Sequence, residues 1–145
     1  MKQALKVGAL YFAAVFAVGF VLGTIRTLWV TPRIGARAAE LIESPIMLVV
    51  VVLAARVVVR RHAELTNWMN WLSVGLFALA LMLLVEFTVV LWVRGLSLAQ
   101  YFATRDPVST MVYFVLLGVF AVLPVLVFQF WRRSSPHSAN SSRAA

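Results

Sequence analysis

Four long apolar segments without charged residues constrain the fold of this chain more than any other feature. They cover residues 7–25, 44–55, 65–85 and 107–131. A helix needs about 20 residues, each rising about 1.5 Å, to cross the hydrocarbon core of a bilayer. Three of the segments reach this length, and residues 44–55 do so only if the helix includes charged residues at its ends. The sequence therefore predicts four membrane spans.

These spans are expected to be helices in one membrane domain. A bilayer tolerates only helices and closed barrels, because its core holds no water to satisfy free backbone groups. The apolar segments lack the alternation of apolar and polar residues that barrel strands have. Hydrophobic residues make up 63% of the chain and charged residues only 12%, a composition that excludes a soluble domain. The expected fold is an all-α bundle of four transmembrane helices within residues 1–133, with spans at about 7–30, 38–60, 68–93 and 108–131.

Lysine and arginine are distributed unequally between the two sides of this predicted bundle. Eight of the 13 lie on the side of both termini and five on the other. The first group is Lys2, Lys6, Arg56, Arg60, Arg61, Arg132, Arg133 and Arg143, and the second is Arg26, Arg33, Arg37, Arg94 and Arg105. Because basic residues accumulate on the cytoplasmic side, both termini are expected in the cytoplasm, with the chain in a bacterial-type inner membrane. The same rule explains the net charge of +8, so nucleic acid is not an expected partner.

The segments outside the spans carry weaker signals. Leu98, Tyr101 and Phe102 have helical spacing, and they follow Ser97, a residue type that caps helix N-termini. This pattern predicts a short helix on the outer membrane surface, although an ordinary loop with apolar anchors fits it equally well. Residues 134–145 are small and polar and are expected to form a disordered tail. All five tryptophans are expected in aromatic belts, since each lies near a span boundary.

Several classes of chemistry are excluded by what the chain lacks. It has no cysteine, which rules out disulfides and thiolate metal sites, and its two histidines lie outside the spans. The phosphate-binding GxxxxGK[ST], the metalloprotease HExxH and the nucleophile GxSxG motifs do not occur. No catalytic residue, metal site or cofactor is therefore expected, and a non-enzymatic protein is favoured.

Charged residues within the spans are the candidates for a functional site. Arg26, Glu43 and Glu86 all fall in the outer leaflet of the predicted topology, and Arg37 and Glu40 lie beside them at the start of the second span. Ionisable groups in a bilayer are costly and usually face the bundle interior. Three interpretations are open: a set of ion pairs that fixes helix register, a site for an ion or small polar ligand, or a catalytic carboxylate.

Small residues indicate which helix faces pack together. Gly19 and Gly23 form a GxxxG step that allows close approach of helices, and Arg26 lies on the same face. Gly75 shares a helix face with Glu86. Arg26 and Glu86 are therefore expected to point inward and to interact, directly or through water. The second span is expected to begin near Arg37 and to bend at Pro45.

The sequence supports a class of protein more firmly than a role. The first hypothesis is an accessory or structural protein that packs with itself or with a larger membrane complex. The second is a small oligomeric transporter or channel built around the outer arginine and glutamates. The third is a membrane-embedded enzyme that modifies a lipid. A closed bundle is expected for the first, a water-accessible cavity reaching Glu86 for the second, and a lateral opening near the carboxylates for the third.

Overall fold

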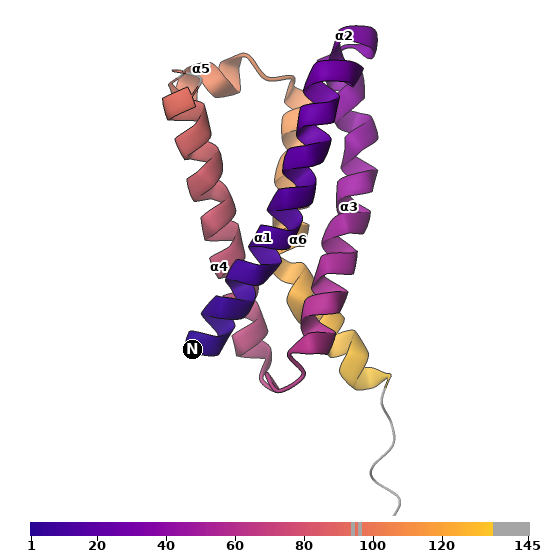
Figure 1. Ribbon diagram of the computed structural model, residues 1–145, viewed down its shortest axis with the longest axis vertical. Helices are drawn as coiled ribbons and strands as arrows, with labels where there is room; N and C mark the ends of the chain where they lie inside the picture. Colours follow the sequence, from indigo (N-terminus) through magenta and orange to yellow (C-terminus); the bar gives the residue numbers. More distant parts are fainter. Residues whose placement is uncertain (94, 96, 135–145) are drawn as a thin grey trace, which may run out of the picture.

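The computed structural model describes residues 1–93, 95 and 97–134, and this part of the chain is helical, with short connections (Figure 1). The elements in chain order are α1 (Lys2–Ile25), the π-helical η1 (Arg26–Val30), α2 (Thr31–Ile34), α3 (Ala36–Arg61), α4 (Trp68–Thr88), the π-helical η2 (Val89–Val93), α5 (Leu98–Ala103) and α6 (Pro107–Arg133).

Four helical stretches are long and apolar enough to cross a membrane, so the chain has the character of an integral membrane protein. The first runs unbroken through η1 and α2, from Lys2 to Ile34, for 33 residues. The others have 26, 21 and 27 residues. The first span is thus longer at both ends than the expected 7–30, and the third changes from α- to π-helical geometry at Val89.

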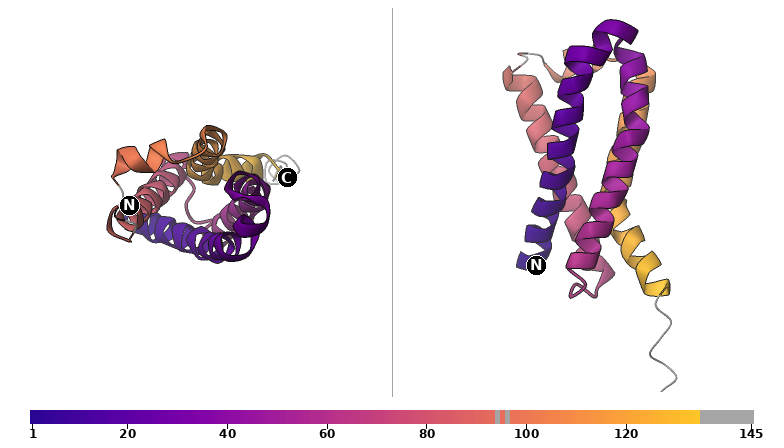
Figure 2. Two further views of the ribbon diagram at one scale, coloured as in Figure 1. Left: turned by 90° about the horizontal axis from the view of Figure 1, so that it is seen from above. Right: turned by 45° about the vertical axis from the view of Figure 1, so that its right-hand side comes forward.

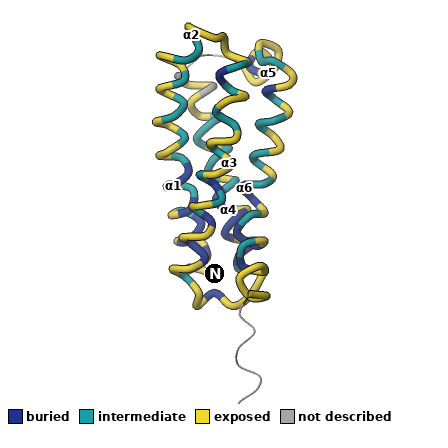
Figure 3. Tube along the Cα trace, turned by 90° about the vertical axis from the view of Figure 1, so that its right-hand side faces the viewer, coloured by how far each residue is buried: buried dark blue, intermediate teal, exposed yellow. Residues whose placement is uncertain are grey.

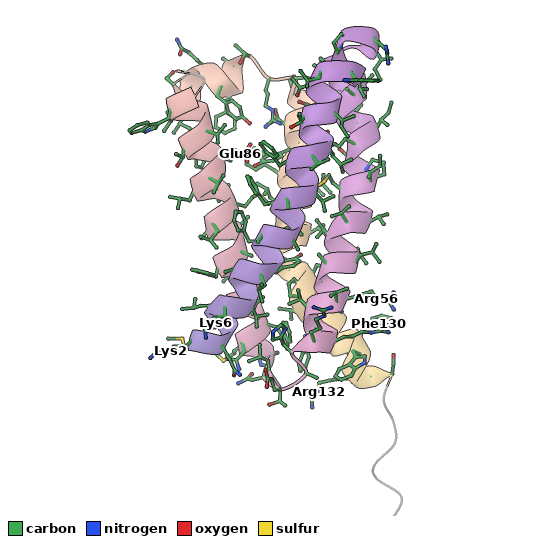
Figure 4. All side chains as sticks on the ribbon, in the orientation of Figure 1. Lys2, Lys6, Arg56, Glu86, Phe130 and Arg132 are labelled. Carbon is green, nitrogen blue, oxygen red and sulfur yellow. The ribbon has the colours of Figure 1, made fainter. Side chains whose placement is uncertain are left out.

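The four long helices form a ring in which α1 packs on α3 and α4, and α6 packs on the same two helices (Figure 2). The N-terminus, the connection between α3 and α4, and the end of α6 lie at one end of the bundle, which we call the basic end (Figure 1). Lys2, Lys6, Arg56 and Arg132 mark that end in Figure 4. Helices α2 and α5 lie at the opposite end. There the chain reverses between α2 and α3 at Gly35, whose φ of 85° is open to glycine and strained for other residues.

The half of the bundle toward the basic end holds the tightly packed core (Figure 3). Tyr11 stacks on Phe120 with ring centroids 4.7 Å apart, and its hydroxyl donates to the Phe120 carbonyl at 3.1 Å. Gly75 lies so close to α6 that an added Cβ would overlap the Ala121 carbonyl oxygen. Packing of this density leaves little room for a ligand in this half.

The position of Trp71 differs from the expectation that all five tryptophans lie in aromatic belts. Its side chain is fully buried in the core, where the indole N–H donates to the Leu65 carbonyl at 2.8 Å. A tryptophan near a span boundary can therefore be a core residue, because its helix position turns it toward the bundle axis. The other four tryptophans (Trp29, Trp68, Trp92 and Trp131) are exposed, as residues facing lipid or its interface would be.

Helices α3 and α5 begin close to the residues expected from the sequence, whereas the bend at Pro45 and the location of α5 on the outer membrane surface stay predictions. Helix α3 begins at Ala36 and continues through Pro45 to Arg61. Helix α5 has Ser97 as its N-cap in a capping box, in which the serine hydroxyl accepts from the Gln100 N–H and the Gln100 side chain accepts from the Ser97 N–H. The predicted disordered tail, apart from Ser134, lies outside the described residues.

Candidate functional site

A cavity of about 900 Å³, open to the outside of the bundle and not fully enclosed, occupies the half of the bundle that faces α2 and α5. Its walls come from α1, η1, α3, α4, η2, α5 and α6, so every long helix contributes. The polar part of the lining includes Arg26, Arg37, Glu40, Glu43, Ser44, Glu86, Tyr101, Arg105, Asp106, Ser109 and Tyr113. Phenylalanine, leucine, valine and methionine side chains line the deeper part. The cavity therefore has a charged region and an apolar region.

Arg26 lies at the centre of the ion pairs in this cavity. Its Nε is 3.0 Å from Glu43 Oε2, and its Nη1 is 3.6 Å from Glu40 Oε1. Glu40 and Glu43 are three residues apart on α3 and so share a helix face toward α1. The N–H of Arg26 is not aimed at Glu43 Oε2, which has no aligned hydrogen bond among the described residues.

A second polar cluster lies where α5 meets the edge of the cavity. The Tyr101 hydroxyl donates to Glu86 Oε1 at 2.9 Å and accepts from Arg105 Nη1 at 2.7 Å. The Arg105 guanidinium lies 5.1 Å from the Tyr101 ring centroid and 4.8 Å from that of Tyr113, both within cation–π range. Arg105 Nη2 also lies 3.8 Å from Glu40 Oε1, which links this cluster to that of Arg26.

Asp106 closes the polar end of the site at the start of α6. Its carboxylate caps the helix by accepting from the Ser109 N–H at 3.0 Å and lies 3.6 Å from Arg37 Nε. The hydrogen bond from Ser109, together with the Arg37 charge, holds the pKa of Asp106 below its usual range. Arg37 is 61% exposed, so this ion pair adds little stability.

The two π-helical segments begin at the polar region of the cavity. Arg26 is the first residue of η1, and η2 begins three residues after Glu86. A π-helical turn is rare and is found frequently at functional sites, because it inserts an extra residue and re-aims the side chains around it. Here it changes helix geometry beside Arg26 and Glu86, two of the three predicted intramembrane charges.

The glycines predicted for helix packing have three different surroundings. Gly75 packs on the α6 backbone, as described above. Gly19 faces the Met47 side chain, which would lie 3.2 Å from an added Cβ. Gly23 has nothing within 4 Å of an added Cβ and lines the cavity. The GxxxG step thus lies against an α3 side chain at Gly19 and borders open space at Gly23.

The structure distributes the predicted site residues over two clusters, those of Arg26 and of Tyr101, and one separate ion pair. Arg26, Glu40 and Glu43 meet directly, whereas Arg37 pairs with Asp106. Glu86 lies in the same half of the molecule (Figure 4), where it accepts a hydrogen bond from Tyr101. A direct contact with Arg26 is not among the ion pairs of the described residues, and the expected contact through water stays a prediction. The cavity itself brings both clusters together.

Sequence reasoning did not identify Tyr101, Arg105, Asp106 and Tyr113 as site residues. Two signals were readable: Tyr101 and Arg105 have the i, i+4 spacing of neighbours on a helical turn, and Asp106 precedes Pro107 as an N-cap would. The Tyr113 hydroxyl, which is buried and has no hydrogen-bond partner among the described residues, gave no such signal.

No protein-family model, curated protein or solved structure matches this chain. Roles for these residues therefore rest on their geometry alone.

Proposed function

We propose that this chain is a non-enzymatic integral membrane protein that binds a small molecule with polar and apolar parts. The observation that supports this most is the cavity of about 900 Å³, because its charged region adjoins a long apolar region. Ligand sites typically enclose about 300–1,000 Å³ and combine apolar walls with a few placed polar groups. Both the volume and the mixed lining are present here. The second of the three sequence hypotheses expected a water-accessible cavity that reaches Glu86; the cavity reaches Glu86, and its access to water stays a prediction.

The alternatives have less support. A purely structural bundle would be closed in both halves, whereas this one is packed only toward the basic end. For catalysis, the described residues contain no cluster of three metal-ligating side chains. The hydroxyls of Ser44 and Thr24 donate to backbone carbonyls one turn before them, which is a structural use. Packing with itself or with a larger membrane complex remains a prediction.

We also propose that the basic end faces the cytoplasm of a bacterial-type inner membrane, with α5 on the outer surface. Lys2, Lys6, Arg56 and Arg132 lie together at that end (Figure 4), as the positive-inside rule requires. The binding site would then open in the outer half of the bilayer.

Cysteine reactivity tests whether the cavity is open, and the chain offers a background without native cysteines. Gly23→Cys places a thiol in the cavity, Ala55→Cys places one in the packed core, and Gly118→Cys places one on the exposed face of α6. In detergent-solubilised protein, N-ethylmaleimide should react with Gly23→Cys much faster than with the other two. A rate at Gly23→Cys as low as that at Ala55→Cys would show that the cavity is closed and would overturn the proposed function.

A further inference from the structure

The charges that line the cavity do not balance. Three arginines (Arg26, Arg37 and Arg105) face four carboxyl groups (Glu40, Glu43, Glu86 and Asp106), which gives a formal excess of one negative charge. The excess can be assigned to one residue, because most of these groups are already paired.

Each of the three arginines has a carboxylate within ion-pairing distance: Arg26 has Glu40 and Glu43, Arg105 has Glu40, and Arg37 has Asp106. Glu86 differs. It accepts a hydrogen bond from the Tyr101 hydroxyl, and no lysine or arginine nitrogen of the described residues lies within ion-pairing distance of it. Arg105, whose Nη1 donates to the same hydroxyl, is near enough for its charge to act on Glu86 but does not form an ion pair with it.

A carboxylate without a counter-ion is unfavourable inside a membrane. Glu86 nevertheless adjoins a space large enough for a ligand, and this space continues along apolar side chains. Phe16, Met47, Met82, Leu117 and Phe120 line this apolar part. The position of Glu86 between the charged and the apolar region suits a cation attached to an apolar chain.

We propose that the cavity binds a single-chain amphiphile whose ammonium group lies against Glu86 and whose alkyl chain lies along the apolar wall. This inference rests on the proposed function and adds the class of ligand. An anionic head group fits less well, because the arginines that would receive it are held by carboxylates. A metal ion would need several ligands, whereas among the described carboxylates of the cavity lining only Glu86 has no cation within ion-pairing distance.

Charged thiol reagents test the preference for a cation. Gly23→Cys is treated with methanethiosulfonates that carry either a trimethylammonium or a sulfonate group, and the ratio of the two rates is measured. Removing the charge with Glu86→Gln in the same background should lower the cation-to-anion ratio roughly tenfold, since one nearby unit charge is lost in a medium of reduced polarity. Glu64→Gln, on an exposed loop residue at the basic end, is the matched control and should leave the ratio unchanged.

Protection experiments distinguish an amphiphile from a small amine. Decyltrimethylammonium should slow the reaction of N-ethylmaleimide with Gly23→Cys, and Glu86→Gln should abolish most of this protection. Decyl maltoside, which has the chain without the charge, and tetramethylammonium, which has the charge without the chain, should protect weakly. Equal protection by tetramethylammonium would contradict the amphiphile and indicate a water-soluble amine.

The outcomes separate this inference from the proposed function. If N-ethylmaleimide reacts with Gly23→Cys but the cation-to-anion ratio of reaction rates is the same with Glu86 and with Glu86→Gln, the cavity is supported and the proposal of a cationic ligand is contradicted. If no reagent reaches Gly23→Cys, both fail.

Discussion

Gly75 of α4 lies against the backbone of α6, and no side chain is available there to move aside. A Cβ at this position would overlap the Ala121 carbonyl oxygen. Gly75→Ala should therefore force α4 and α6 apart and destabilise the bundle by about 1–3 kcal/mol, as overpacking in a dense core does.

The measurement is thermal or denaturant unfolding in a mild detergent. Gly118→Ala is the matched control, because an added Cβ at Gly118 meets nothing within 4 Å. Its effect should stay within about 0.5 kcal/mol. Equal stability of the two variants would show that α4 and α6 do not meet in this register.

Single side chains also show where sequence reasoning succeeds and where it stops. The cost of charge in a bilayer was enough to single out Arg26, Glu43 and Glu86 as residues that face the interior of one half of the bundle. It could not assign partners to them. Arg26 meets Glu43 because α1 and α3 are rotated toward each other, and Glu86 meets Tyr101 because α5 folds back over the cavity. Both depend on the path of the chain between helices, which no local pattern specifies.

The helices themselves follow closely from local physics. Apolar length defines the four spans, and side-chain caps define the beginnings of α5 at Ser97 and of α6 at Asp106. Gly35 supplies the positive φ at which α2 ends and α3 begins. These features act within one or two turns, so they are readable from sequence.

The π-helical segments η1 and η2 are the elements that could not be predicted from the sequence. Neither contains glycine or proline. The η2 segment continues its apolar span without a change of composition, whereas η1 begins at the charged Arg26. A π-helical turn arises when neighbouring helices favour an inserted residue, so its position depends on packing across the bundle. Its occurrence beside Arg26 and Glu86 could be found only in three dimensions.

The bundle as a whole is divided into a packed half and an open half. In the packed half near the basic end, aromatic side chains such as Tyr11 and Trp71 fill the core, and Gly75 allows α4 to approach α6 closely. Charged groups and a cavity occupy the other half. This division lets one half maintain the fold while the other remains available to a ligand.

The proposed orientation assigns the open half to the outer leaflet, and it can be tested by labelling intact cells. Ala63→Cys lies in the connection between α3 and α4, and Ala103→Cys lies at the end of α5; both alanines are exposed. An impermeant maleimide should label Ala103→Cys in intact cells, and Ala63→Cys only after the membrane is permeabilised. The reverse pattern would place the basic end outside.

The most direct test of the binding site is native mass spectrometry of the protein purified in a mild non-ionic detergent. The wild type should carry a bound amphiphile of defined mass. Gly23→Phe fills the cavity with a ring and should lose this mass, whereas Gly118→Phe, the same change on an exposed face of α6, should keep it. A wild-type protein without any bound molecule, or a Gly23→Phe variant that keeps the same mass in the same proportion, would contradict a ligand site in the open half of the bundle.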